Sequence, residues 1–340
     1  MAVKQLKLGL VGATGMVGSE FIKILQERQI PVSELRPFAS EKSAGKSLHF
    51  RGQDYPLQTL KEGCFVGLDA VFFSAGGSIS KIWAPKAVQE GAYAIDNSST
   101  FRMHPEIDLI VPEVNGDLLE KRKEPALIAN PNCSTIQLML ALAPLQKKFG
   151  LKSVRVATYQ SVSGAGIEAV EELKSHTLAY LNNKEMEPRV FRENIGFNNL
   201  PLIGDLEDSG YSNEEEKMIH ESRKILRQED LKVSAFCVRT PTINGHSEAV
   251  WAEINKSIEK EEFLSALKGA PGVKVHDGRS DSYTSNRKCD GTDPVYIGRV
   301  HRDYYDQKTW LFWCVADNIR KGAALNGIQI AEMIFDINNK

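Results

Sequence analysis

The strongest constraint on the fold is a glycine-rich turn between an apolar run and an amphipathic segment near the N-terminus. The apolar run is LKLGLV at residues 6–11, and apolar residues recur at helical spacing from Met16 to Leu25. Between them the chain reads Gly12-Ala13-Thr14-Gly15-Met16-Val17-Gly18, a G-x-x-G-x-x-G spacing. Strand, glycine turn and helix in this order are typical of the opening unit of a dinucleotide-binding fold, since glycines let the backbone approach a pyrophosphate and the helix N-terminus attracts the anion.

Strand and helix patterns continue to alternate through the first third of the chain. We expect strands at 35–39, 69–74, 93–96 and 109–111, and a helix at 80–90. Pro85 is tolerated in a first helical turn, so the start of that helix is left open. This alternation predicts an α/β fold with a Rossmann-like, parallel, doubly wound sheet.

After Asn130 the pattern changes to α+β. We expect helices at 133–149 and 167–182, strands at 153–161, 233–238 and 248–254, and an irregular stretch to about residue 213. Segments 295–302 and 309–316 predict a hairpin, which suits a mostly antiparallel sheet. The last helix, at 319–335, is amphipathic enough to return to the first domain. The predicted domains are therefore 1–132, completed by a C-terminal helix at 318–340, and 133–317.

Charge and cysteine content exclude several classes of partner. The 340 residues carry 42 Lys and Arg against 44 Asp and Glu, a net charge of -2, which argues against nucleic acid or anionic membrane held by bulk charge. Five widely spaced cysteines without a C-x-x-C pair argue against a disulfide framework or a structural metal site. The cysteine pattern therefore predicts a reducing, cytoplasmic environment and no metal. No apolar stretch is long enough to span a membrane, so we expect a soluble protein.

The predicted cofactor is NADP, bound through the glycine turn by Gly12, Thr14, Gly15, Met16 and Val17. The discriminating residue lies at the end of the second strand, where an acid accepts the ribose hydroxyl and a base accommodates a 2′-phosphate. Ser40, Lys42 and Ser43 offer one cation and two hydroxyls, which favours NADP. Glu41 lies between them, and the preference weakens or reverses if Glu41 faces the ribose.

The segment Asn130-Pro131-Asn132-Cys133-Ser134-Thr135 places a cysteine where a proline-set turn enters an apolar helix. A helix N-terminus lowers a thiol pKa and so raises the reactive thiolate fraction. We therefore predict a nucleophile at Cys133. The other four cysteines are interpreted as inert buried thiols.

A set of motifs together resembles the aspartate-β-semialdehyde dehydrogenases. The motifs are GATGMVGSE, NSSTFRM, PEVN, NPNCSTIQ, YQSVSGAG, EEEKMIHESRKIL and RTPTINGHS, and they follow the family's order over nearly the whole chain. The resemblance implies NADPH-dependent reduction of L-aspartyl-4-phosphate to L-aspartate-4-semialdehyde and phosphate through a cysteine thioester. This reaction lies on the route to lysine, methionine and threonine.

The resemblance also implies roles for individual residues. Cys133 attacks the acyl phosphate, Gln160 orients the acyl group, and His246 moves the proton as general acid and base. Arg102 and Lys217 bind the phosphate, and Arg239 clamps the substrate carboxylate, for which a guanidinium provides a matching fork. Glu214 recognises the substrate ammonium, although the adjacent Glu215 and Glu216 leave room for a one-residue shift.

Small and polar residues are implied around the cofactor, and the second domain is implied to catalyse and dimerise. The residues are Ser74, Ala75, Gly76, Ser163 and Gly164, with Asn318 contacting the carboxamide. The family is homodimeric, which fits a broad antiparallel sheet packing against its twin.

Three other readings compete with this one. N-acetylglutamyl-phosphate reductase shares the architecture and the thiol, and a catalytically silent dinucleotide sensor could retain the fold without the chemistry. Tyr180 and Lys184 form a Y-x-x-x-K pair of the short-chain dehydrogenase type. The helix-breaking Asn182 and Asn183 favour chance as the origin of that pair.

Overall fold

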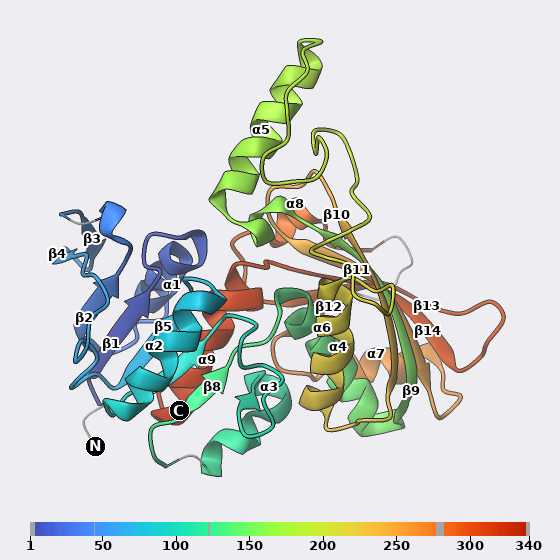
Figure 1. Ribbon diagram of the computed structural model, residues 1–340. Helices are drawn as coiled ribbons and strands as arrows, with labels where there is room; N and C mark the ends of the chain where they lie inside the picture. The colour runs from blue at the N-terminus through green and yellow to red at the C-terminus, as the bar shows by residue number, and fades with distance from the viewer. Residues whose placement is uncertain (1–3, 44, 122, 277–281, 338–340) are drawn as a thin grey trace. The chain divides into compact units, whose positions relative to one another are not determined.

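A computed structural model describes residues 4–43, 45–121, 123–276 and 282–337 (Figure 1). By contacts between Cα atoms the chain divides into two compact units. One consists of Met1–Pro131 with Ala323–Lys340, and the other of Asn132–Gly322. Each unit has a six-stranded sheet of its own, and they are described in turn.

The sheet of the first unit has the order β2-β1-β5-β6-β8-β7, and every neighbouring pair is parallel. The predicted Rossmann-like sheet is therefore confirmed. Its strands are β1 (Leu6–Val11), β2 (Val32–Phe38), β5 (Ala70–Phe73), β6 (Tyr93–Asp96), β7 (Asp108–Leu109) and β8 (Leu127–Ala129), and a small hairpin pairs β3 (Ser47–Phe50) with β4 (Gln53–Pro56). The helices are α1 (Met16–Glu27), α2 (Gly77–Gln89), α3 (Pro112–Asn115) and α9 (Leu325–Ile334).

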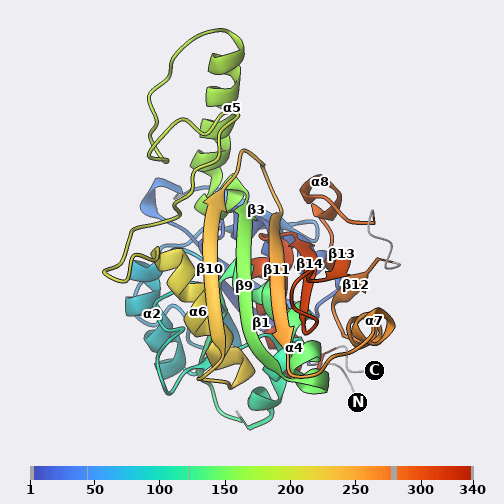
Figure 2. The ribbon, with the colours of Figure 1, turned by 90° about the vertical axis from the view of Figure 1, so that its right-hand side faces the viewer.

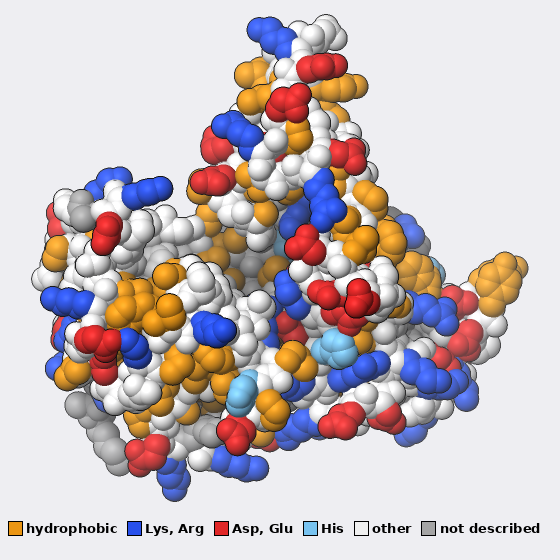
Figure 3. Space-filling model, in the orientation of Figure 1, with side chains coloured by type: hydrophobic (Ala, Val, Ile, Leu, Met, Phe, Trp, Pro, Cys, Tyr) orange, Lys and Arg blue, Asp and Glu red, His pale blue; other side chains and the backbone are white. Residues whose placement is uncertain are grey.

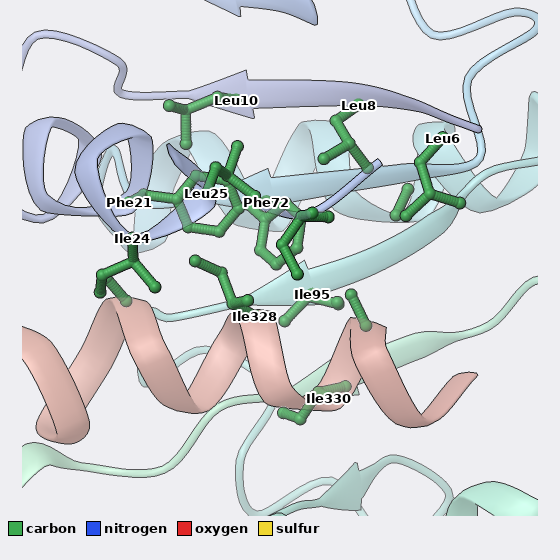
Figure 4. Packing of buried hydrophobic residues seen from close by; sticks show 14 of the residues in the cluster. Leu6, Leu8, Leu10, Phe21, Ile24, Leu25, Phe72, Ile95, Ile328 and Ile330 are labelled. Carbon is green, nitrogen blue, oxygen red and sulfur yellow. The ribbon is translucent and has the colours of Figure 1, made fainter. Parts of the chain in front are cut away.

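One face of this sheet is packed by α1 and α9. Phe21 of α1 contacts Phe72 of β5, with ring centroids 4.0 Å apart. Figure 4 shows Ile328 of α9 beside these side chains, and all of them belong to one buried apolar cluster. The C-terminal segment thus supplies core residues to the sheet formed by the N-terminal segment. A π-helical turn, Arg320–Ala324, precedes α9 within the helix predicted at 319–335.

The structure corrects the prediction for α2. This helix begins at Gly77, three residues earlier than the predicted 80–90, and it contains Pro85 in its interior. A proline inside a helix removes one backbone hydrogen bond and crowds the preceding turn. The helix tolerates Pro85 because it is long and because its Ser80, Ala84 and Ala87 are packed in the core.

The sheet of the second unit has the order β10-β9-β11-β14-β13-β12. The β9–β11, β11–β14 and β13–β14 pairs are antiparallel, whereas β9–β10 and β12–β13 are parallel. This mixed sheet confirms the predicted α+β character and the predicted hairpin. The strands are β9 (Leu151–Gln160), β10 (Lys232–Arg239), β11 (His246–Ile254), β12 (Val273–Val275), β13 (Val295–Arg302) and β14 (Thr309–Ala316).

Helices cover one face of this second sheet. The helices of the unit are α4 (Cys133–Phe149), α5 (Ile167–Leu181), α6 (Asn213–Leu226), α7 (Lys260–Lys268) and α8 (Asn286–Cys289). Helix α4 packs on β9, β11, β13 and β14, and α6 packs on β10. Figure 2 shows β10, β9 and β11 in front of these helices, with the opposite face of the strands open toward the viewer. That open face presents Tyr159 and Phe236, which are 41% and 55% exposed.

Helix α5 extends beyond the sheet of its unit (Figures 1 and 2) and organises the irregular segment that follows it. The buried carboxylate of Glu172 accepts hydrogen bonds from the backbone N–H groups of Arg189, Val190 and Phe191. The helix ends at Leu181, and Tyr180 is 63% exposed and lies against Phe197. An exposed tyrosine that packs against a phenylalanine is not in the surroundings of a catalytic tyrosine. This agrees with a chance origin for the Y-x-x-x-K pair.

Removing the aromatic contact in the first core should destabilise the protein. For Phe72→Ala we expect the free energy of unfolding to fall by about 3–5 kcal/mol, because the change leaves a cavity between α1 and β5. Denaturant titration measures the loss. Ile82→Ala, at a position of α2 that is 54% exposed, is the control and should change the value by less than about 0.5 kcal/mol. Equal losses in the two variants would contradict this description of the core.

Candidate active site

Three of the predicted site residues lie side by side at one end of the second sheet. Arg239 is paired with Gln160 across β10 and β9, and the register of β9 with β11 places His246 next in the same row. Their side chains lie on the face covered by α4, and all three are buried. The order of the strands thus gathers residues that are far apart in the sequence into one polar row.

Cys133 is the first residue of α4, as predicted. The side chain of Asn132 caps the helix, with its Oδ1 accepting hydrogen bonds from the backbone N–H groups of Ser134 and Thr135 at 3.0 and 3.2 Å. Cys133 is the one free cysteine among the five that is not buried. It also interacts electrostatically with Arg239, which places the thiol beside the polar row.

Gly322 leaves room for this thiol. A Cβ atom built on Gly322 would lie 2.9 Å from the Cβ of Cys133, so a side chain at 322 would displace the cysteine. Gly322 belongs to the π-helical turn before α9, and such turns are frequent at functional sites. Sequence analysis missed this residue because a contact between distant segments leaves no local signal.

Glu214 is the acid of its triplet that reaches the polar row. Its Oε1 accepts hydrogen bonds from Asn132 Nδ2 at 2.8 Å and Gln160 Nε2 at 3.3 Å, and its Oε2 accepts one from Lys217 Nζ at 3.1 Å. Burial opposes ionisation, but the charge of Lys217 and the bond from Asn132 outweigh it and lower the pKa of Glu214 to about 2. The carboxyl group is therefore an anion at neutral pH.

The neighbouring acids have other partners. Glu215 forms a capping box with Ser212 and accepts the backbone N–H of Cys237. Glu216 bonds to Ser209 and His220 at the surface. Of the three acids, Glu214 is the one that contacts Gln160, so the geometry favours Glu214 over a one-residue shift.

Lys217 is paired with Glu214 and not separated from it. From the sequence, Lys217 was expected to bind the substrate phosphate and Glu214 the substrate ammonium. The structure brings them into one ion pair, in which the lysine side chain is 31% exposed and the glutamate side chain 8%. Any anion that binds Lys217 must therefore compete with Glu214.

His246 is fully buried and neutral. Burial and the charge of Arg239 lower its pKa to about 3. Its Nδ1 accepts the backbone N–H of Ser161 at 3.1 Å, so the ring proton of the neutral form lies on Nε2. Among the described residues Nε2 has no hydrogen-bond partner, and it faces Gly164, whose added Cβ would lie 3.1 Å away. The site thus presents a hydrogen-bond donor toward a position that only a glycine leaves open.

Ser163 and Asn318, predicted to approach the cofactor, are buried and bonded to each other. Asn318 Nδ2 donates to Ser163 Oγ at 2.9 Å, and Asn318 Oδ1 accepts the hydroxyl of Ser161 and the backbone N–H of Gly245. This network holds Ser161 against His246. Ser161 was not predicted as a site residue, although it lies in the motif YQSVSGAG.

The glycine turn of the first unit has the shape expected for binding a pyrophosphate. Gly12 has a φ of +88°, and an added Cβ there would lie 2.5 Å from the backbone oxygen of Ser74. An added Cβ on Gly18 would lie 2.4 Å from the oxygen of Gly12. Thr14 and Gly15 are exposed at the turn, and Met16 and Val17 begin α1. Both glycines are therefore needed for the tight passage from β1 into α1.

The two helices of this unit that follow a glycine, α1 and α2, have no side-chain cap at their N-termini. The residue before α1 is Gly15 and the residue before α2 is Gly76, and neither helix start receives a side-chain hydrogen bond in the described structure. Backbone N–H groups at uncapped helix starts are ready to bind phosphate oxygens. Ser74 and Ala75 lead into the second of these starts, directly after β5.

The residues proposed to select NADP follow β2. Ser40 precedes a short helical turn, Glu41–Ser43, in which Glu41 and Lys42 are both exposed.

Arg102 belongs to the first unit and is buried there. Its Nε donates to the backbone oxygen of Asn130 at 2.9 Å, and its Nη2 donates to that of Asn97 at 2.9 Å. Two carbonyl oxygens thus orient the guanidinium, which also interacts electrostatically with Asp96.

The four remaining cysteines are buried, and burial raises the pKa of each of their thiols. The pKa of Cys289 rises to about 12, and those of Cys64, Cys237 and Cys314 rise as well. Raised pKa values keep these sulfurs protonated and unreactive. In the described residues no group of three or more His, Cys, Asp or Glu side chains is arranged to hold a metal ion. No helix in the described ranges is long and apolar enough to cross a membrane.

Comparison with known families agrees with this site. Residues 7–122 match the NAD binding domain of semialdehyde dehydrogenases, and residues 142–321 match the semialdehyde dehydrogenase dimerisation domain. The fold and the site thus define a two-domain semialdehyde dehydrogenase.

Individual relatives narrow the class. An aspartate-semialdehyde dehydrogenase from Aquifex aeolicus is 49% identical over 96% of this chain and 97% of its own length. The crystal structure of aspartate semialdehyde dehydrogenase II complexed with ASA from Vibrio cholerae is 40% identical, with a TM-score of 0.95 over 98% of this chain and 99% of that one. The enzyme from Candida albicans, solved with NADP, is 25% identical with a TM-score of 0.77, over 98% of this chain and all of that one.

The chain belongs to the aspartate-semialdehyde dehydrogenase family. The resemblance, the oxidoreductase activity and the place in amino-acid biosynthesis are confirmed by these matches. The NAD binding domain confirms a nicotinamide dinucleotide cofactor, and the dimerisation domain agrees with the predicted homodimer.

The buried histidine predicts a loss of stability in acid. An unfolded histidine binds a proton below its ordinary pKa of 6.5, whereas folded His246 stays neutral down to about pH 3. The unfolded state therefore binds more protons between these values, and the free energy of unfolding falls as the pH falls, by up to about 1.4 kcal/mol per pH unit from this group. His246→Gln should remove this part of the slope between pH 6.5 and 5, measured by denaturant titration. The surface variant His220→Gln should retain it, and an unchanged slope in His246→Gln would contradict burial in the neutral form.

Proposed function

We propose that catalysis in this enzyme proceeds through a thioester on Cys133 and uses NADPH. The observation that carries the proposal is the position of Cys133, half-buried at the capped start of α4 and beside Arg239. A helix N-terminus and a neighbouring guanidinium both favour the thiolate form. Among the five thiols it is the one accessible to a substrate.

In the biosynthetic direction the Cys133 thiolate attacks the β-carbonyl carbon of L-aspartyl-4-phosphate. A carbon–sulfur bond forms, the bond from that carbon to the phosphate oxygen breaks, and inorganic phosphate leaves. His246, the proposed general acid and base, donates the N–H on its Nε2 to the carbonyl oxygen as negative charge develops on it. Gln160, whose amide is held by Glu214, orients the acyl group.

The remaining charges match the remaining groups of the substrate. Arg239 binds the α-carboxylate through its two-pronged guanidinium. The anionic Glu214 binds the α-ammonium, which takes the place of Lys217 on its carboxylate and releases the lysine toward the phosphate. Arg102 supplies the second cation for that phosphate.

The cofactor would be held by residues of both domains. Gly12, Thr14, Gly15, Met16 and Val17, with Ser74, Ala75 and Gly76, offer two uncapped helix starts to the phosphates. Ser40, Lys42 and Ser43 would bind the 2′-phosphate, and Ser163, Gly164 and Asn318 the nicotinamide side. NADPH, when bound, would supply the hydride that reduces the acyl group. The carbon–sulfur bond to Cys133 would then break, which releases the aldehyde and returns the thiolate.

The two units would have different functions. Residues 1–132 with the C-terminal helix would bind the dinucleotide, and residues 133–317 would provide catalysis and the dimer contact. The open face of the second sheet, with Tyr159 and Phe236 exposed, suits packing against a second copy. Interspersed positive and negative side chains on the face shown in Figure 3 fit an enzyme of the cytoplasm without a nucleic-acid partner.

The test of this function is phosphate-dependent reduction of NADP⁺ by L-aspartate-4-semialdehyde, run with and without alkylation of thiols. Cys133→Ser should lower the rate by at least about 10³-fold and leave NADP binding intact, because a hydroxyl is a poor nucleophile here. Cys64→Ala, which changes a buried thiol, is the control and should keep activity.

Each other reading has its own outcome in this assay. Activity with N-acetylglutamate semialdehyde in place of the first aldehyde would support the reductase alternative. Bound NADP without activity toward either aldehyde would support the silent sensor. Substantial turnover by Cys133→Ser would exclude the thioester on this residue.

The choice between NADP and NAD depends on which side chain after β2 meets the ribose. Lys42→Ala should raise the KM for NADPH at least about tenfold and leave the KM for NADH unchanged, because it removes a cation from the 2′-phosphate site. Steady-state kinetics with both cofactors measure this. Lys46→Ala is the matched control on the same segment. If Glu41→Ala changes the NADH values and Lys42→Ala changes nothing, Glu41 sets the preference.

A further inference from the structure

A second row of side chains lies on the same face of the sheet, two residues along each strand from the row that holds Arg239, Gln160 and His246. Glu248 of β11 is paired with Thr158 of β9 and with Cys314 of β14, and Thr158 is paired with Cys237 of β10. Since side chains two residues apart share a face of a strand, this row also faces α4. The chemistry described above uses none of its members.

The side chain of Glu248 lies close to that of Gln137, a residue of α4. Gln137 lies one helical turn after Cys133, and its backbone oxygen is 3.7 Å from the Sγ of Cys314, the neighbour of Glu248 in the row. Glu248 is 0% exposed and Gln137 is 1% exposed. In the described residues the carboxyl oxygens of Glu248 and the polar atoms of the Gln137 amide have no partner outside this pair, and the amide lies close enough to the carboxyl group to interact with it as a hydrogen-bonding group.

These four atoms satisfy one another only if the carboxyl group is protonated. A carboxylic acid donates its O–H to the amide oxygen and accepts an amide N–H on its carbonyl oxygen, which gives two bonds in a ring. A carboxylate has no proton to donate and would leave the amide oxygen of Gln137 unpaired in the interior.

The surroundings of Glu248 favour the acid form. Burial raises the pKa of Glu248 well above its ordinary value, and the approach of Gln137 opposes this only in part. The titratable groups beside it in the row are the thiols of Cys237 and Cys314, whose pKa values are also raised. Neither thiol offers a positive charge to a carboxylate.

We propose that Glu248 is a positioning residue that, as a neutral carboxylic acid, forms a paired hydrogen bond with the amide of Gln137 and fixes the first two turns of α4. The pair ties α4 to β11, the strand that carries His246. It thereby sets the position of Cys133 relative to the Nε2 of His246. This inference rests on the proposed role of Cys133 as the nucleophile.

Two substitutions at Glu248 distinguish pairing from charge. Glu248→Gln retains one donor and one acceptor and can form the same ring with Gln137, so we expect kcat within about twofold of the wild type. Glu248→Leu leaves the amide of Gln137 unpaired, and we expect kcat to fall about ten- to a hundredfold, since a small misplacement of a reacting group has such effects. The KM for NADPH should not change in either variant.

Val250→Ala is the matched control for lost packing. Val250 follows Glu248 on the same face of β11 and is 1% exposed. This variant should lower the free energy of unfolding and leave kcat of the folded enzyme within about twofold. A fall in kcat equal to that of Glu248→Leu would overturn the proposal, because general loosening of the sheet would then explain both.

The pH dependence of Cys133 alkylation gives a second measurement. Mass spectrometry follows the peptide that contains Cys133, while the buried thiols react slowly. A neutral Glu248 predicts the same apparent thiol pKa in Glu248→Gln and in the wild type. If Glu248 were an anion, its removal would lower that pKa, and this result would overturn the proposal.

Infrared difference spectroscopy tests the protonation state without reference to activity. The wild type minus Glu248→Gln spectrum at pH 8 should contain the carbonyl band of a protonated carboxyl group, and its absence would overturn the proposal even if Glu248→Leu fails to fold. If Cys133→Ser remains active, the proposed function fails, whereas the infrared band still decides the state of Glu248. Unchanged kcat in folded Glu248→Leu would remove Glu248 from any role in positioning.

Discussion

Two buried acidic side chains of α6 hold Asn132, the residue that precedes the proposed nucleophile Cys133. Glu214 accepts a hydrogen bond from the side chain of Asn132 at 2.8 Å, and Glu221 accepts one from its backbone N–H at 2.7 Å. Asn132 in turn caps α4. The start of α4 is therefore fixed by α6, and the position of Cys133 depends on this cap. A charge-assisted bond is stronger than a neutral one, and it is stronger still where water is excluded.

The partners of Glu214 also explain how opposite charges coexist in a small buried region. Glu214 is ionised because Lys217 and Asn132 compensate for its burial, and its charge also stabilises Arg239. His246 is neutral, because burial and the nearby charge of Arg239 outweigh the opposing charge of Glu214. In the proposed function, the substrate brings a carboxylate, an ammonium and a phosphate to these groups. A site built of paired ions can exchange its internal partners for those of the substrate without leaving a bare charge.

Local signals in the sequence were enough for many of the elements. Helix α4 begins at Cys133 and ends at Phe149, as expected from the Asn-Pro-Asn turn and the apolar run that follows. The predicted start of α2 was less accurate. Pro85 was expected near the first helical turn, whereas in the structure Pro85 lies in the helix interior, where tertiary packing tolerates it. The role of Gly322 was not foreseen, because its contact with Cys133 joins segments distant in the sequence. Glu214 could not be separated from Glu215 and Glu216 by pattern, since only their partners in the folded chain differ.

Strand register accounts for the arrangement of the site. Residues at alternate positions of β10, β9 and β11 share one face, so a polar residue at the end of each strand produces a polar row, and the residue two positions earlier produces the row behind it. Moving one strand by a single residue would turn His246 or Gln160 to the opposite face. The apolar residues further along the same face, such as Val250 and Val156, pack in the interior and resist that shift. The core of the second unit thus fixes the register, and the register brings the reactive groups together.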